Sequence, residues 1–187
     1  MITIASIKLK IKALLLILLL ANSSLALAQE NYYEENEMKR RHLISFSISH
    51  THISQGLEEN ESTWLILPSY GIDYNFKISP MWSIGLHNDI IIESFSILKA
   101  DGKTELERTR PFVSILTAGF KPGKHLTYQL GFGGEFAEED HFFLTRIGLE
   151  YGWEISERME FFTNLIYDVK WNNYNSYVIG LGVTRKL

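Results

Sequence analysis

The chain of 187 residues contains no cysteine. This absence excludes disulfide bonds, and it also excludes the lipid-modified cysteine on which lipoprotein processing depends. Long apolar runs are missing after Gln29, where no stretch reaches the 18 residues typical of a membrane-spanning helix. We therefore expect neither a lipoprotein nor a helical membrane protein.

The N-terminus has the pattern of an export signal. Three lysines precede a short apolar run over residues 13–21, and the small-residue sequence Ala26-Leu27-Ala28 stands directly before Gln29. That order of charge, apolar core and small residues is how a secretory signal peptide is built. The apolar run is too short to span a bilayer as a helix, which needs about 20 residues. The sequence therefore predicts a cleavable signal peptide over residues 1–28.

The remaining chain is acidic and has the length of one domain. Removing the three signal lysines leaves 15 basic residues against 22 acidic ones. This negative balance opposes binding to nucleic acid, which requires basic side chains on phosphates. A polar, acidic segment over residues 29–40 is expected to lie in the periplasm, and residues 41–187 are expected to form a single folded unit.

From residue 42 onward the apolar residues alternate with period two, which predicts β-strands. Alternation is clearest over residues 126–136, where Leu130 and Phe132 oppose Gln129 and Gly131. Asn88 interrupts an otherwise apolar face, and the fourth strand has apolar residues on both faces, so its register stays ambiguous. Eight strands are expected, at about 42–53, 63–77, 82–98, 109–120, 126–136, 143–153, 161–171 and 177–187.

The connections between these strands alternate in character. Tight turns are expected at 78–81, 121–124 and 155–158. Looser, mostly acidic links are expected at 54–62, 99–108, 137–141 and 172–175. An even strand number, with short turns at one end and longer loops at the other, is typical of an outer-membrane β-barrel.

A soluble eight-stranded barrel of the lipocalin kind has the same alternation but places its apolar face inside. The tryptophans favour the membrane alternative, because all four lie on the apolar face at strand ends. Aromatic girdles at two opposite interfaces are expected of a transmembrane barrel. Trp64 and Trp171 fall at the loop end, and Trp82 and Trp153 fall at the tight-turn end.

With its signal peptide, eight strands, aromatic girdles and C-terminal closing strand, the chain resembles the small outer-membrane barrels of the OmpX and OmpA-transmembrane-domain type, also described as porin-family barrels. The resemblance covers the whole mature chain but is architectural, and the last residue is Leu187 where many such proteins carry an aromatic. It implies a monomer in the outer membrane of a Gram-negative bacterium. It also implies contact with membrane lipid and lipopolysaccharide and assembly by the outer-membrane insertion machinery.

The polar face of the predicted strands points into the lumen. Eight strands make an interior that side chains just fill, so its charges must be paired. We interpret them as a network that plugs the barrel, with a proton or ion path as the alternative. The expected lumen residues are Asp73, Lys77, His87, Asp89, Glu93, Glu135, Arg146, Glu150, Asp168 and Lys170.

His50 and His52 form the most unusual local pattern. Residues two apart on a strand point the same way, so both imidazoles are expected to face lipid at the outer rim, near Ser54. Contact with lipid head-group phosphates is the interpretation we favour. A metal site at these histidines would need a third ligand, which the local pattern does not supply. A catalytic Ser–His–acid set is the other alternative, and it is defined by geometry and not by sequence spacing. No metal or cofactor is expected.

The outer links carry acid clusters, such as Glu105 with Glu107 and Glu138 with Glu139. These indicate a solvated rim, with cation bridging to lipopolysaccharide or a basic partner as alternatives. Members of the resembled class include structural proteins, adhesins, conduits and lipid A enzymes, so the fold does not fix the activity. We expect a non-enzymatic protein with a structural or surface-interaction role. A lipid A-modifying hydrolase or acyltransferase at the outer rim and a narrow conduit for small or hydrophobic molecules are the alternatives.

Overall fold

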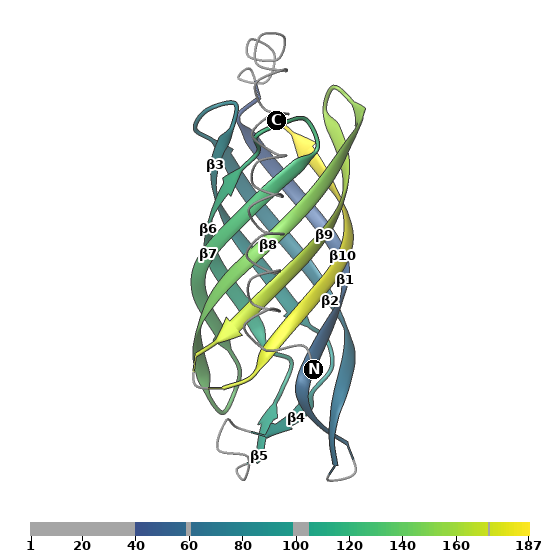
Figure 1. The fold of residues 1–187 in the computed structure, drawn as a ribbon, viewed down its shortest axis with the longest axis vertical. Coiled ribbons are helices and arrows are strands. Elements are labelled where there is room, and N and C mark those ends of the chain that lie inside the picture. Colours follow the sequence, from purple (N-terminus) through teal and green to yellow (C-terminus); the bar gives the residue numbers. More distant parts are fainter. Residues whose placement is uncertain (1–39, 59–60, 99–104, 172) are drawn as a thin grey trace, which may run out of the picture.

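The computed structural model describes residues 40–58, 61–98, 105–171 and 173–187. The expected signal peptide lies outside these residues. Eight long strands form a closed antiparallel barrel, with a small hairpin at one end (Figure 1). Within the described residues, no helix is long and apolar enough to cross a membrane.

The barrel strands follow one another around the ring in sequence order, and the last pairs with the first. Pairing runs from Leu43 with Lys186 to Ile53 with Ser176, so the sheet has no open edge in the barrel wall. The expectation of an eight-stranded up-and-down barrel is confirmed. The strands are β1 (His42–Glu58), β2 (Glu61–Lys77), β3 (Trp82–Ile91), β6 (Phe112–Phe120), β7 (Leu126–Phe136), β8 (His141–Ser156), β9 (Met159–Lys170) and β10 (Asn175–Lys186).

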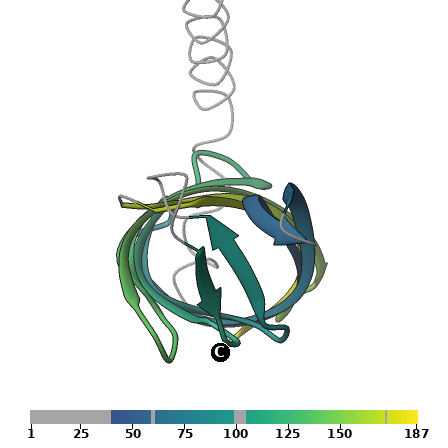
Figure 2. The ribbon, with the colours of Figure 1, turned by 90° about the horizontal axis from the view of Figure 1, so that it is seen from below.

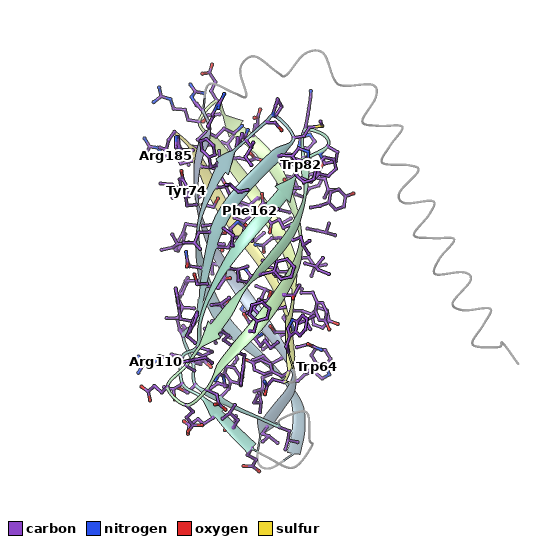
Figure 3. All side chains as sticks on the ribbon, turned by 90° about the vertical axis from the view of Figure 1, so that its left-hand side faces the viewer. Trp64, Tyr74, Trp82, Arg110, Phe162 and Arg185 are labelled. Carbon is purple, nitrogen blue, oxygen red and sulfur yellow. The ribbon has the colours of Figure 1, made fainter. Side chains whose placement is uncertain are left out.

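Every wall strand has an exposed apolar face on the outside of the barrel. On β6, whose register was ambiguous in the sequence, Leu116 is 66% exposed while its neighbour Ile115 is fully buried. On β7, Leu130 and Phe132 are exposed and Gln129 is buried. The side chains of Figure 3 project from the whole outer surface of the barrel. An apolar exterior around a polar interior is the arrangement of a transmembrane barrel, and it rules out the lipocalin alternative.

The third strand is shorter than expected. The predicted strand over 82–98 breaks after Ile91, and the chain leaves the wall at residues 92–94. The next segment, β4 (Phe95–Leu98), pairs with β5 (Glu105–Arg108) and with Gly56 and Leu57 of β1. In the view along the barrel, this hairpin lies across the mouth (Figure 2).

The physical reason for the break is the burial of Phe95 and Ile97. Both fall on the lumen-facing side of the predicted strand, and both are buried in the structure, at 6% and 0% exposed. Folding the hairpin inward removes these large apolar side chains from water. The link predicted over 99–108 accordingly ends in a strand.

Two further boundaries differ from the sequence expectation. The first link, expected over 54–62, is mostly strand, because β1 extends to Glu58 and β2 begins at Glu61. The fourth strand begins at Phe112 and not near residue 109. Pro111 has no amide hydrogen for the ladder, and Arg110 before it has a φ of 41°, which turns the chain out of the extended conformation.

Close packing fills the lumen around Phe162 of β9. The ring of Phe162 points inward and is 1% exposed. A Cβ on Gly182 of the neighbouring strand would lie 2.4 Å from its Cζ atom, so this position needs glycine to admit the ring. The interior at this level is therefore packed with side chains.

Candidate functional site

Two aromatic belts mark the ends of the apolar exterior. Trp64 and Trp82 lie at opposite ends of the barrel (Figure 3). Trp64 stacks on Tyr177 with ring centroids 6.2 Å apart, and the indole nitrogen of Trp171 donates to Thr145 Oγ1 at 3.0 Å. Indole rings with an apolar body and a polar edge suit the membrane–water interface. The exterior between the belts therefore faces membrane lipid.

At the loop end, the β4–β5 hairpin lies across the mouth of the barrel and packs on an apolar cluster. Phe95 of the hairpin and Phe142 of β8 both contact Tyr174 edge-to-face, with ring centroids 6.0 and 6.2 Å apart. Burial of these side chains stabilises the hairpin in the mouth. We call this group the outer cluster; its members are Ile53, Leu67, Ile91, Phe95, Ile97, Leu106, Phe142 and Tyr174.

A buried ion pair joins the hairpin to the wall. Arg108 of β5 donates to Glu135 Oε1 of β7 from Nε at 3.1 Å and from Nη2 at 2.5 Å. Its Nη1 donates to the carbonyl oxygen of Asp140 at 2.6 Å, and its guanidinium lies 4.3 Å from the centre of the Phe142 ring. A fully buried arginine is stable only when its charge and its donors are satisfied in this way.

Glu135 has two more partners on the other side of the mouth. The Tyr174 hydroxyl donates to both carboxylate oxygens, at 2.6 and 2.8 Å, and Lys170 Nζ lies 3.4 Å from Oε2. Burial, and then the neighbouring Glu135 carboxylate, raise the pKa of Tyr174 well above its usual value. The hydroxyl therefore stays protonated and keeps donating, so one carboxylate holds together the hairpin and two parts of the wall.

The middle of the lumen is organised by Arg146. Its Nε and Nη2 donate to the two carboxylate oxygens of Asp168 at 2.7 and 2.8 Å, and its Nη1 lies 2.7 Å from Asp89 Oδ2. Toward the tight-turn end from this group, His87 Nε2 lies 3.0 Å from Asn75 Oδ1, and His87 Nδ1 lies 3.9 Å from Asp73 Oδ2. This layer is a bidentate charge network of the kind that fixes buried arginines.

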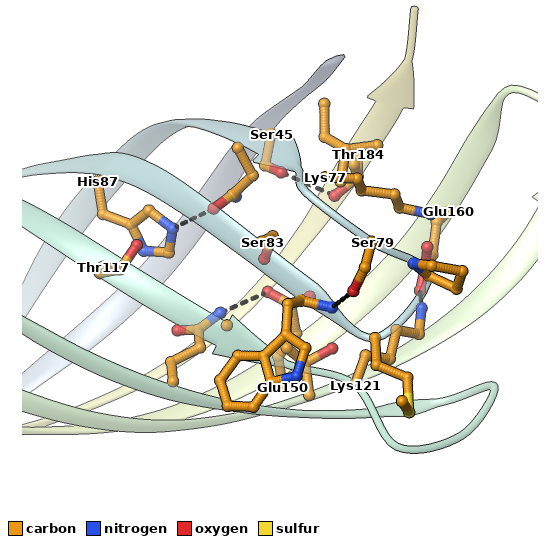
Figure 4. A pocket seen from close by; sticks show the side chains of 18 residues that line it. Ser45, Lys77, Ser79, Ser83, His87, Thr117, Lys121, Glu150, Glu160 and Thr184 are labelled. Atoms are coloured by element: carbon orange, nitrogen blue, oxygen red, sulfur yellow. Dashed lines mark hydrogen bonds and ion pairs between the residues drawn. The ribbon is translucent and has the colours of Figure 1, made fainter. Parts of the chain in front are cut away.

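A small cavity occupies the tight-turn end of the lumen (Figure 4). It has a volume of about 60 Å³ and extends from the β2–β3 turn at Ser79 to His87. Lys121 contacts Glu160 at 2.9 Å on its wall, and Gln129 donates to Glu150 at 3.3 Å. The polar side chains on its wall and this volume suit a few water molecules.

The structure places the sequence-predicted lumen residues inward, with one exception. Glu93 lies in the exposed bend between β3 and β4, so its assignment to the lumen is wrong; the strand ends two residues before it. Sequence reasoning missed Arg108, Lys121, Glu160 and Tyr174. Arg108 carried a signal, because Glu105 to Arg108 alternates between exposed acids and the buried Leu106 and Arg108.

The rim residues His50, His52 and Ser54 lie on β1. His50 is exposed and His52 is half-buried, both on the outward face of β1, opposite Pro68 and Ile66 of β2. Ser54 follows on the same strand and is half-buried. Among the described residues, no group of three His, Asp or Glu side chains is placed to hold a metal ion.

No protein-family model matches the chain. No curated protein matches it either. Solved structures do match in fold: Neisserial surface protein A (NspA) is 12% identical with a TM-score of 0.53 over 78% of this chain and 97% of that chain. OprG from Pseudomonas aeruginosa is 10% identical with a TM-score of 0.52, covering 79% and 96% of the two chains.

A third similar structure is Ail, the attachment invasion locus protein of Yersinia pestis, in complex with the heparin analogue sucrose octasulfate. It is 8% identical with a TM-score of 0.52, covering 79% of this chain and 99% of that chain. At these identities the likeness concerns the fold. Together with the apolar exterior and the two aromatic belts, it identifies the chain as a small eight-stranded β-barrel of the outer-membrane type, which spans that membrane.

Proposed function

We propose that this protein is a non-enzymatic outer-membrane barrel with a sealed lumen and a structural or surface-interaction role. The observation that carries the proposal is the buried pair of Arg108 and Glu135, which fixes the β4–β5 hairpin in the mouth. Ions crossing the barrel would have to displace both this pair and the outer cluster. Dehydration of an ion against such an apolar layer is costly, so the closed form opposes conduction.

The outer surface then becomes the part available to partners. Glu105 and Glu107 of the hairpin and Glu138 and Glu139 of the β7–β8 loop are exposed at this end. Their negative charge favours cationic partners, either divalent cations bridging to lipopolysaccharide phosphates or basic groups on another macromolecule. The sealed hairpin gives these acids a rigid support.

Planar-bilayer recording tests the seal. Purified protein, with insertion verified by protease protection, is expected to give no steady conductance. In the matched control variant, a short glycine-serine linker replaces residues 93–109, which removes the hairpin. The conductance of this variant measures how much the hairpin contributes to the seal. Steady single-channel currents from the wild-type protein, at the level of the linker variant, would contradict the sealed lumen and favour the conduit.

Mass spectrometry of lipid A tests the non-enzymatic part of the proposal. Lipid A from a deletion strain and from the same strain complemented with the wild-type gene is expected to have one acylation pattern. A pattern that changes on complementation would establish an activity on lipid A and overturn the proposal.

A further inference from the structure

Two polar side chains stand next to each other on the lipid-facing wall. Asn88 of β3 and Ser114 of β6 are direct neighbours in the sheet register and lie on the outward face of their strands. Ser114 Oγ donates to Asn88 Oδ1 at 2.9 Å. Around them, Leu86, Ile90 and Leu116 are apolar and exposed, as the lipid face requires.

Asn88 lies deep in the hydrocarbon layer. It is six residues from Trp82, which belongs to the belt at the tight-turn end. With a rise of about 3.3 Å per residue and a tilt of about 40°, the separation along the membrane normal is about 15 Å. The apolar band of such barrels is about 25 Å tall, so Asn88 is close to its middle.

The hydrogen bonds within this barrel leave part of the Asn88 amide unused. Its Nδ2 contacts the carbonyl oxygen of Ile72 at 3.4 Å, which is long for a hydrogen bond and uses one of two donors. Among the described residues, the second donor has no partner. Acyl chains cannot accept a hydrogen bond, so an unused donor at this depth is costly.

Two threonines on the outward face make their hydrogen bonds differently. Thr163 donates its single hydroxyl hydrogen to the carbonyl oxygen of Gly180 at 3.0 Å, and Thr145 accepts from Trp171 at the interface. Their hydrogen bonds are made within the same barrel. Asn88 thus differs from these two threonines in combining a mid-membrane position with an unused donor.

We propose that a second copy of this chain docks on the β3–β6–β7 face, with the Asn88 amides of the two copies hydrogen-bonded across a two-fold axis. A primary amide carries both donors and an acceptor, so it is complementary to itself and fits an isologous contact. Ser114 and then Gly134 continue the row from Asn88 across β6 and β7. Their small size allows two walls to approach closely, as small residues do between membrane helices.

This dimer replaces the monomer expected from the sequence, and it does not depend on the sealed lumen. Lipid supplies no donor or acceptor at the depth of Asn88, whereas a second barrel offers the matching group at the same depth. The interface also leaves both tight-turn and loop ends of each barrel free. Association through it is therefore compatible with any partner at the outer surface.

Cysteine crosslinking in proteoliposomes tests the contact, since the chain has no cysteine of its own. Leu86→Cys and Leu116→Cys place thiols beside Asn88 and Ser114. Ile179→Cys on β10 is the matched control: it is likewise exposed, and the ring order puts β10 opposite β6. Oxidation is expected to give disulfide-linked dimers at positions 86 and 116, well above the yield at 179.

Asn88→Leu in the Leu116→Cys background separates the polar contact from random collision. Leucine suits the lipid face, so the barrel is expected to fold. The association constant, read from crosslinking against protein-to-lipid ratio, should fall roughly three- to thirty-fold. Equal yields at the three positions, or an association constant unchanged by Asn88→Leu, would overturn the proposal. Crosslinks to another protein in cells, with none in pure liposomes, would overturn the second copy as the occupant.

Discussion

Arg108 and Glu135 are buried together, at 0% and 1% exposed side chain, although one belongs to a hairpin outside the barrel wall and the other to a wall strand. Their side chains are linked by two hydrogen bonds to a single carboxylate oxygen. An unpaired charge is costly in this environment, so the position of the hairpin and the pairing of Glu135 depend on each other.

Replacing Arg108 by methionine keeps most of the side-chain volume and removes the charge. We expect the free energy of unfolding, measured by urea titration in liposomes, to fall by about 3–5 kcal/mol, because Glu135 loses its principal partner. Adding Glu135→Gln should recover part of this loss, so the two effects should not be additive. Glu107→Gln, on the same strand but exposed, is the control and should change stability by less than about 0.5 kcal/mol. A similar loss of stability in Arg108→Met and in Glu107→Gln would argue against a contribution from the buried pair.

Leu130 tests the lipid face. It lies mid-strand on β7 and is half exposed. Leu130→Arg should lower the free energy of folding into liposomes by about 2–4 kcal/mol, whereas Ile155→Arg at the end of β8 should cost about 0–1 kcal/mol, because the penalty depends on depth. If both substitutions were equally harmless, the exterior would not be in contact with hydrocarbon.

Much of this fold was predictable because period-two alternation determines which side of a strand faces lipid. The strand 126–136 is found as β7 with the expected faces, and the four tryptophans lie at the two ends. The hairpin was not predicted. The alternation over 82–98 changes phase at Ile90, Ile91 and Ile92, and reading the segment as one continuous strand overlooked this change. A second signal was the size of Phe95 and Ile97, two large apolar residues at lumen positions of a narrow barrel.

The residues of the candidate site also divide into those that the alternation predicted and those that it did not. Arg146 and Asp168 follow from strand parity, because each lies on the polar face of a strand with clear alternation. Arg108 and Tyr174 did not follow, since both lie in segments read as links; the alternation beside Arg108 spans four residues only. Long-range closure of such segments depends on tertiary contacts that a local pattern does not contain.

Substitution of the rim histidines tests whether these residues catalyse a reaction on lipid A. Substituting both His50 and His52 by Gln keeps hydrogen bonding and removes the titratable rings. We expect normal barrel assembly and an unchanged lipid A acylation pattern, measured by mass spectrometry. Loss of a general base would lower an acyl-transfer rate typically 10²–10⁴-fold. Suppose that the deletion strain has a lipid A acylation pattern different from that of the wild type. A folded double variant that gives the deletion-strain pattern would then identify the histidines as catalytic.

The export signal gives a prediction about the mature N-terminus. Ala26 and Ala28 fit the small-residue positions of a cleavage site, so the mature chain should begin at Gln29. Edman sequencing or top-down mass spectrometry of outer-membrane material measures this directly. Recovery of an assembled barrel that still begins at Met1 would show that the segment is retained.

The most direct measurement of the sealed mouth compares two single-cysteine variants of the hairpin on intact cells, with a membrane-impermeant maleimide. Ile97 is fully buried on β4, and Glu107 is exposed on β5. The sealed arrangement predicts rapid labelling of Glu107→Cys and strong protection of Ile97→Cys until the protein is denatured. Equal labelling rates at the two positions in the folded protein would show that the hairpin does not close the barrel.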